Sequence, residues 1–221
     1  MKRAFRAVLF DLDGTLIDSA PDLAGAGNEM RIARGLTPHP LAHFRPMVGS
    51  GARGMVGRAF DVGPDDAGFA ALRDEFLQRY EARMTQLTHV FPEMLPVLAA
   101  LEARATPWGI VTNKASRFSE PLVRALGLAP LASTLVSGDT TPHAKPHPEP
   151  LLEAARRIGI SADACVYVGD DLRDVQAGRA AGMTTVAAAW GYLGAGEPIE
   201  RWGADHVVAT PDGLLKLLQM A

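Results

Sequence analysis

The stretch AVLFDLDGT at residues 7–15 sets an apolar run directly before two carboxylates, Asp11 and Asp13, and a Gly-Thr turn. Such a run is typical of a buried strand, and the turn marks its end. In an extended chain residues i and i+2 point the same way, so the two carboxylates should lie together at the carboxyl end of that strand. A surface turn uses the same residue types, so the rest of the chain has to decide between a turn and a site.

From about residue 90 onward, short apolar runs alternate with helical patterns, which predicts βα units around a parallel sheet. Each run is too short for a helix. The runs are Trp108–Val111, Thr134–Val136, Cys165–Val168, Thr184–Ala189 and His206–Val208. Glycines stand where the helices between them should end, at Gly127, Gly159 and Gly182. We therefore expect an α/β fold.

Residues from about 18 to 89 carry no convincing strand and several helical segments. The clearest helix has apolar residues at three- and four-residue steps, a face that packs against other helices. These residues are Phe69, Leu72, Phe76, Tyr80 and Met84. We predict two parts, a sheet-based core formed by residues 1–17 and 90–221, and a helical insertion at 18–89.

The 221-residue chain is 48% hydrophobic and 21% charged, so it can bury a sizeable core. Its formal net charge of -3 offers no positive field, so neither nucleic acid nor a membrane is expected as a partner. Cys165 is the only cysteine, which excludes an intrachain disulfide and fits a reduced compartment. The first apolar stretch meets Asp11 too early for a signal peptide or a membrane span, so we expect a cytoplasmic protein.

Polar residues follow two of the apolar runs where each should end. Thr112 and Asn113 come directly after the first run, Asp170 and Asp174 come after the third, and Lys145 lies between them. Ligands of doubly wound sheets lie outside the carboxyl ends of the strands, so these residues should converge. Hydroxyl and amide groups hold phosphoryl oxygens, and an ammonium offsets their charge. Each residue alone is compatible with a turn, a solvated charge or a helix N-cap, but together they predict a Mg²⁺ and phosphate site.

These motifs resemble, in order, those of the haloacid dehalogenase superfamily. They are DLDGT at 11–15, TN at 112–113, Lys145 and GDDLRD at 169–174, and they bracket nearly the whole chain. The resemblance implies a Rossmann-like core with an α-helical cap inserted after the first strand, which agrees with the insertion predicted above. It also implies a Mg²⁺-dependent phosphomonoester hydrolase that acts on a small phosphorylated metabolite.

The same resemblance implies a role for each residue of the motifs. Asp11 is the nucleophile that forms an aspartyl-phosphate, and Asp13 is the general acid and base. Lys145 neutralises the site, while Thr112 and Asn113 bind the phosphoryl group.

The resemblance also implies the metal ligands. Asp170 binds Mg²⁺ together with Asp11 and the backbone carbonyl of Asp13, and Asp174 helps to hold the ion. Asp171 falls where relatives often have a smaller residue, so its role stays open, as does the oligomeric state.

Within the superfamily the chain is similar to phosphoglycolate phosphatases. It is more similar still to N-acetylmuramic acid 6-phosphate phosphatases of cell-wall recycling, through Gly51-Ala52-Arg53, WGIVTNK at 108–114, Gly191-Tyr192 and WGAD at 202–205. The expected substrate is N-acetylmuramic acid 6-phosphate or 2-phosphoglycolate, with the first ranked ahead. A sugar-phosphate mutase shares all the core residues and remains an alternative, because transfer to sugar instead of water depends on cap closure.

A dinucleotide-binding module is a further alternative, because GSGARG at 49–54 fits the glycine-rich pattern and Asp74 lies about twenty residues beyond it. Pro46 makes a poor strand before the glycines, and Asp74 lies in a helical pattern instead of at a strand end. We instead interpret the glycines as a flexible cap loop that presents Arg53, its only cation, to the substrate.

Overall fold

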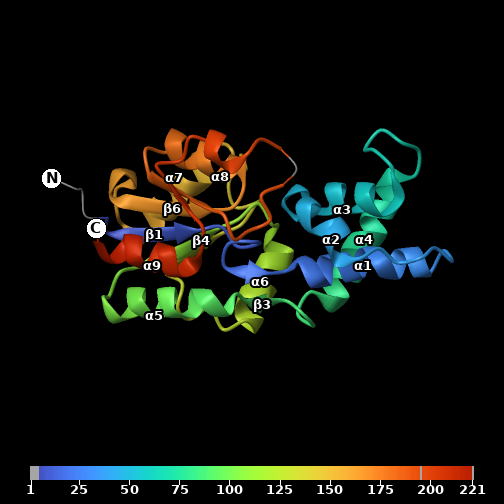
Figure 1. Cartoon of the computed structure of the whole chain (residues 1–221), viewed down its shortest axis with the longest axis horizontal. Coiled ribbons are helices and arrows are strands. Elements are labelled where there is room, and N and C mark those ends of the chain that lie inside the picture. Colours follow the sequence, from blue (N-terminus) through green and yellow to red (C-terminus); the bar gives the residue numbers. More distant parts are fainter. Residues whose placement is uncertain (1–4, 195, 221) are drawn as a thin grey trace.

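The computed structural model describes residues 5–194 and 196–220, and within them six parallel strands form one sheet in the order β5-β4-β1-β6-β7-β8 (Figure 1). The strands are β1 Ala7–Phe10, β4 Trp108–Val111, β5 Thr134–Val136, β6 Cys165–Gly169, β7 Thr184–Ala188 and β8 His206–Val208. All six were predicted, and only the last residues of β6 and β7 differ from the prediction, by one position each. The parallel α/β architecture is therefore confirmed.

The order of the strands determines which loops lie next to one another at the edge of the sheet. The chain runs from central β1 outward through β4 and β5, then returns to β6 on the other side of β1. Phe10 is aligned with Ile110 in β4 and with Val168 in β6. The residues that follow these three strands therefore emerge together where the strand order reverses, which is where doubly wound sheets bind ligands.

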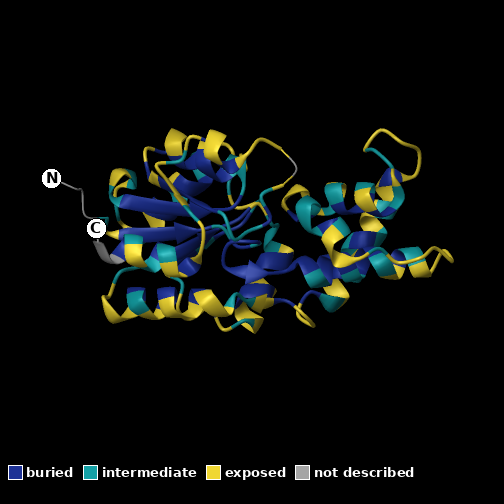
Figure 2. Cartoon of the chain, in the orientation of Figure 1, coloured by how far each residue is buried: buried dark blue, intermediate teal, exposed yellow. Residues whose placement is uncertain are grey.

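Helices cover both faces of the sheet. One face packs against α5 Leu95–Ala103, α6 Ser116–Ala125 and α9 Pro211–Met220. The other face packs against α7 Glu149–Ile158 and α8 Leu172–Ala180. Short 3-10 turns complete the core at η2 Pro92–Met94, η3 Ala162–Ala164 and η4 Ile199–Arg201. The central strands β1, β4 and β6 are buried throughout, whereas the edge strand β8 is largely exposed (Figure 2).

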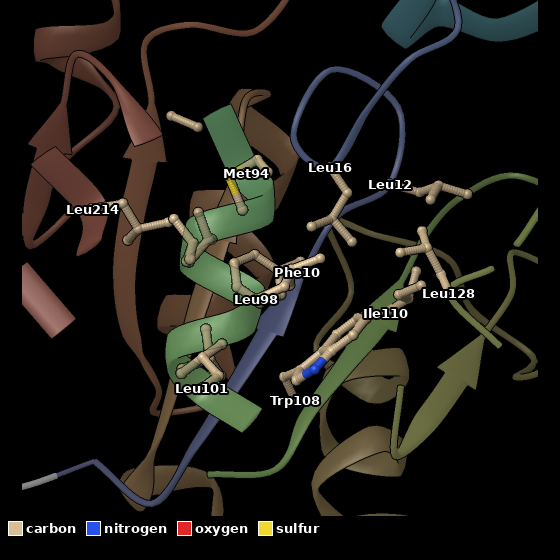
Figure 3. Close-up of a cluster of buried hydrophobic side chains, with 14 of the residues drawn as sticks. Phe10, Leu12, Leu16, Met94, Leu98, Leu101, Trp108, Ile110, Leu128 and Leu214 are labelled. Carbon is tan, nitrogen blue, oxygen red and sulfur yellow. The ribbon is translucent and has the colours of Figure 1, made fainter. Parts of the chain in front are cut away.

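An apolar cluster holds β1 and β4 in place beneath α5 (Figure 3). Phe10 meets Trp108 edge to face with ring centroids 6.2 Å apart, and Leu98 from α5 packs over them. Each such buried side chain stabilises the fold by about 1.5–3 kcal/mol. Because this packing fixes the position of β1, it also fixes the positions of Asp11 and Asp13, which follow that strand.

The segment 18–89, called the cap below, consists of helices joined by loops, and lies beyond the carboxyl edge of the sheet (Figure 1). It contains α1 Ala20–Ile32, α2 Leu41–Phe44, η1 Arg45–Ser50, α3 Gly51–Phe60 and α4 Phe69–Arg83. These helices share their own apolar cluster, which Phe118 and Tyr192 of the core join. Among the described residues, no helix combines the length and apolar character that a membrane crossing needs.

Two short strands connect the core and the cap. β2 Ile17–Asp18 pairs antiparallel with β3 His89–Val90, so the chain enters and leaves the cap side by side. The predicted domain boundaries fall inside these two strands, and the exact division stays a prediction. Tyr192 secures this hinge, since its hydroxyl accepts from the backbone N-H groups of Ser19 and Ala20 and donates to Asp18.

The flexible loop predicted for the glycine-rich stretch at 49–54 is wrong. Arg45–Ser50 forms η1 and Gly51 begins α3. The small residues of this stretch are compatible with a helix, and Arg53 lies in the first turn of α3. The elements directly before these glycines are α2 and η1 and not a β-strand, so the context that a dinucleotide site needs is missing.

Candidate active site

Asp11 and Asp13 lie just beyond β1, at the edge where β4 and β6 also end. The Asp11 backbone N-H donates to the Val168 carbonyl at 2.9 Å, which ties the turn to β6. The Asp13 carboxylate accepts from the Ser19 hydroxyl at 2.5 Å and pairs with Lys114 Nζ at 3.0 Å. Asp13 is therefore oriented by one residue at the hinge of the cap and one after β4.

Asp170 follows β6, and each oxygen of its carboxylate accepts one hydrogen bond. It accepts from the Thr15 hydroxyl at 2.8 Å and from the Tyr192 backbone N-H at 2.7 Å. Glycines make room for it, because a Cβ at Gly14 or Gly191 would lie 2.2 or 2.1 Å from Asp170 atoms. Gly14 also has a φ of 89°, which favours glycine. The glycine of the DLDGT stretch thus serves close packing around a carboxylate 156 positions away in sequence, since 170 − 14 = 156.

Three carboxylates gather into one cluster. Oxygens of Asp11, Asp170 and Asp174 all lie within 4.8 Å of one another. Burial raises the pKa of Asp11 to about 7; the charge of Lys145 opposes this rise and that of Asp174 adds to it. Burial and the charges of Asp11 and Asp174 also raise the pKa of Asp170 well above its usual value. An all-oxygen set whose members repel one another fits a hard divalent cation such as Mg²⁺.

Lys145 is the cation at the centre of these acids and is 5% exposed. Its Nζ lies 2.7 Å from Asp11 Oδ1 and 2.7 Å from Asp174 Oδ1. The Val111 carbonyl and the Tyr167 hydroxyl lie 2.9 and 2.8 Å from the same atom. Burial alone would lower the pKa of Lys145, but the charges of Asp11 and Asp174 outweigh it and raise the pKa, so the ammonium stays charged.

Asn113 holds Lys145 in position through its backbone. The Asn113 amide nitrogen donates to the Lys145 carbonyl at 2.9 Å, and its oxygen accepts from the Lys145 N-H at 2.9 Å. The Thr112 hydroxyl accepts from the Lys114 N-H at 3.0 Å and retains its own hydrogen for a further acceptor. The side chain of Asn113 is therefore engaged with the protein, whereas that of Thr112 can still donate.

Asp171, whose role the sequence left open, is the N-cap of α8. Its carboxylate accepts from the Arg173 N-H at 2.9 Å, while the Asp174 carboxylate accepts from the Asp171 N-H at 3.1 Å. This reciprocal capping box satisfies two N-H groups that the helix leaves unpaired. Asp174 thus joins three functions, since it caps the helix, anchors Lys145 and belongs to the acidic cluster.

A cavity of about 310 Å³ lies between these acids and the cap. Its core side carries the residues described above, including Asp11, Asp13, Thr112, Asn113, Lys145, Asp170 and Asp174. Its cap side is mostly apolar and is lined by Leu23, Val48, Ala52, Phe76, Leu77 and Tyr80. The helical face expected to be core therefore also forms the wall of the cavity through Phe76 and Tyr80.

The sequence reasoning missed several residues around the acids. Thr15 and Tyr167 were read as part of a turn and of an apolar strand, yet their hydroxyls bind Asp170 and Lys145. Lys114 was noted only for its place after β4, although its Nζ pairs with Asp13 and lies 4.9 Å from the centre of the Tyr80 ring. Their positions beside the motif residues were the available signal.

Arg53 is separate from this group. It is exposed on α3, and the residues that line the cavity include its neighbours Gly51 and Ala52 but not Arg53. Its contact with substrate remains a prediction. All the other site residues predicted from the sequence line the same cavity.

The fold and the site together define a capped α/β enzyme whose sheet edge gathers acids around a buried lysine. The chain belongs to the haloacid dehalogenase-like hydrolase family, whose model matches residues 5–182. The resemblance drawn from the sequence motifs is therefore confirmed.

Full-length relatives carry two different substrate names. The chain is 49% identical to a phosphoglycolate phosphatase of Xanthomonas campestris pv. campestris strain 8004 over 95% of this chain and 94% of that one. It is 42% identical to an N-acetylmuramic acid 6-phosphate phosphatase of Pseudomonas aeruginosa over 100% of this chain and 98% of that one. A crystal structure described as a predicted phosphoglycolate phosphatase of Haemophilus somnus 129PT superposes with a TM-score of 0.84 at 27% identity, covering 98% and 99% of the two chains.

Proposed function

We propose that the protein is a Mg²⁺-dependent phosphomonoester hydrolase that works through an aspartyl-phosphate on Asp11. The observation that carries this proposal is the placement of Asp11 Oδ1 2.7 Å from the Lys145 ammonium, beside Asp170 and Asp174. A carboxylate held in this way is oriented for attack, and the positive charge beside it lowers its repulsion from an incoming phosphate.

The two steps of the proposed reaction use Asp11 and Asp13 in turn. The Asp11 carboxylate attacks phosphorus, the bond from phosphorus to the ester oxygen breaks, and protonated Asp13 donates its proton to the leaving alkoxide. Asp13 then takes a proton from water, whose oxygen attacks the phosphorus of the aspartyl-phosphate; the bond from phosphorus to Asp11 breaks, which releases inorganic phosphate and the free Asp11 carboxylate. Ser19 and Lys114 hold the Asp13 carboxylate ready for both transfers.

The proposed ligands of Mg²⁺ are the carboxylates of Asp11 and Asp170 and the backbone carbonyl of Asp13, with Asp174 helping to hold the ion. When bound, Mg²⁺ supplies charge that offsets the carboxylates and the phosphoryl oxygens. The raised pKa values of Asp11 and Asp170 are consistent with this assignment, because burial and the charge of neighbouring carboxylates disfavour the ionised form of each acid.

The remaining residues serve the phosphoryl group. Thr112 is proposed to donate its hydroxyl hydrogen to a phosphoryl oxygen, and Lys145 to neutralise developing charge. Asn113 was assigned to the phosphoryl group as well, but its amide bonds to Lys145 favour a positioning role for its side chain. Any contact of Asn113 with phosphate would then come from its backbone N-H.

N-acetylmuramic acid 6-phosphate is the substrate that we rank first, with 2-phosphoglycolate second. A two-carbon acid would occupy little of a cavity of about 310 Å³, whereas an amino sugar with its substituents fills such a volume. The apolar cap wall suits the face of a sugar ring. This substrate would place the enzyme in cell-wall recycling in the cytoplasm, acting on small molecules and without nucleic acid or membrane partners.

The test compares two proteins on several substrates. The wild-type protein should release phosphate from N-acetylmuramic acid 6-phosphate with the highest kcat/KM in a panel that also includes 2-phosphoglycolate and other sugar phosphates. Asp11→Asn should abolish turnover and leave the circular dichroism spectrum unchanged. Persistent turnover by a pure Asp11→Asn preparation refutes the covalent route, and isomerised sugar in place of free phosphate identifies a mutase.

A further inference from the structure

Arg173 makes a contact that the proposed chemistry does not use. It lies in the first turn of α8, and Asp171 holds its guanidinium at two points, with Nε to Oδ1 and Nη2 to Oδ2 both at 2.8 Å. A planar guanidinium bound by both oxygens of one carboxylate has a fixed direction. The side chain is therefore oriented before it meets any further partner.

That direction leads to the cap. The same Nη2 donates to the backbone carbonyl of Gly49 in η1, 124 positions away in the sequence. Gly49, Asp171 and Arg173 all line the cavity. The contact thus joins the core to the cap at the margin of the space where the substrate is proposed to bind.

The identity of Gly49 fits this contact. A Cβ at this position would lie 3.0 Å from Asp171 Oδ2, which is tighter than ordinary packing, and 3.4 Å from Arg173 Nη2, which is at the limit of ordinary contact. Gly49 is not among the glycines with a positive φ, so its backbone conformation is open to other residues. A side chain at this position would therefore crowd the Asp171 and Arg173 side chains that make the contact.

We propose that Arg173, oriented by Asp171, is a positioning residue that latches the cap over the active site by binding the Gly49 carbonyl. A hydrogen bond from a charged donor is stronger than a neutral one. Because Asp171 belongs to the core, it retains the guanidinium when the cap opens, and the latch can re-form without reordering the long side chain. The latch favours the closed cap, in which water is excluded from the phosphate site.

A double-mutant cycle tests the latch, with kinetics that rest on the proposed phosphatase function. Arg173→Ala removes the donor, and Gly49→Ala adds a methyl group that crowds the Asp171 and Arg173 side chains at the contact. Each should lower kcat/KM for N-acetylmuramic acid 6-phosphate about tenfold, chiefly through KM. The kcat/KM of the double variant should be no lower than that of the less active single variant. Effects that multiply would overturn the latch, because two residues that act independently lose activity independently.

Amide hydrogen exchange provides a second measurement that needs no turnover. Arg173→Ala and Gly49→Ala should both speed exchange in η1 and α3, because the cap spends more time open. Arg179→Ala is the matched control, since Arg179 is an exposed arginine of the same helix, and it should leave exchange in the cap unchanged. Faster exchange confined to α8 in Arg173→Ala would show a role in that helix alone and overturn the proposal. This outcome is independent of which substrate the enzyme hydrolyses.

Discussion

The core side and the cap side of the cavity are built in different ways. On the core side, polar groups hold one another in place, as Lys145 contacts four oxygens and Asp170 accepts two hydrogen bonds. On the cap side, apolar side chains such as Val48 and Phe76 form the wall, and Gly49 supplies one polar link to the core. The reacting groups are therefore held by a network of hydrogen bonds and ion pairs. The wall that would contact the substrate is held in place by apolar packing of the cap helices.

This difference teaches which changes the enzyme should tolerate. A buried network of charges responds strongly to the loss of one member, because its partners are left unpaired in a region that excludes water. An apolar wall responds in proportion to the volume changed.

Removal of divalent metal should abolish activity. EDTA should reduce turnover to background and added Mg²⁺ should restore it, because the oxygens of Asp11 and Asp170 need a cation between them. Mg²⁺ should also raise the melting temperature of the wild-type protein but not of Asp170→Asn, which differential scanning fluorimetry measures. Full activity after exhaustive chelation would contradict the assignment of the cluster.

Replacement of the buried ammonium should be the most damaging single change after loss of the nucleophile. Lys145→Met should lower kcat by about a hundredfold to a thousandfold, since Asp11 and Asp174 lose the charge between them. Steady-state kinetics and thermal melts measure the effect. Lys216→Met is the control, because Lys216 is exposed and pairs only with Asp212, and it should behave like the wild type. A kcat for Lys145→Met within threefold of wild type would mean that the core network is dispensable.

Filling the cap side should separate large substrates from small ones. Ala52→Phe adds volume to the wall from the half-buried first turn of α3. It should lower kcat/KM for N-acetylmuramic acid 6-phosphate about tenfold and for 2-phosphoglycolate by less than about threefold, because only the larger substrate needs that space. Equal losses on both substrates would show that the cap wall does not select by size.

The smallest effect is expected at Arg53. The side chain is exposed and lies outside the cavity lining, so Arg53→Ala should change kcat/KM by less than about threefold. Kinetics on both candidate substrates measure this. A KM raised by more than that would support the contact with substrate predicted from the sequence, and would mean that a charged residue of the cap takes part in recognition.

The sequence was most informative where local geometry decides the outcome. Asp11 and Asp13 could be placed together because an extended chain repeats every second residue. Asp170 could be placed near them because parallel strands end at one edge. The helical insertion was likewise readable from its periodicity. The glycine-rich stretch misled, because small residues permit a loop and a helix N-terminus equally well, and α3 forms through packing against α1 and α4.

By itself, the sequence determined the order of strands and helices, the family, and the set of acids that the sheet brings to one edge. Only the tertiary structure decided how those groups are paired: that Asn113 grips the backbone of Lys145, that Asp171 caps α8 and orients Arg173, and that Phe76 faces a cavity. The physical reason is distance along the chain. Periodicity governs neighbours within a few residues, whereas a partner from a different element, such as Lys145 for Asn113, depends on how whole elements pack against one another.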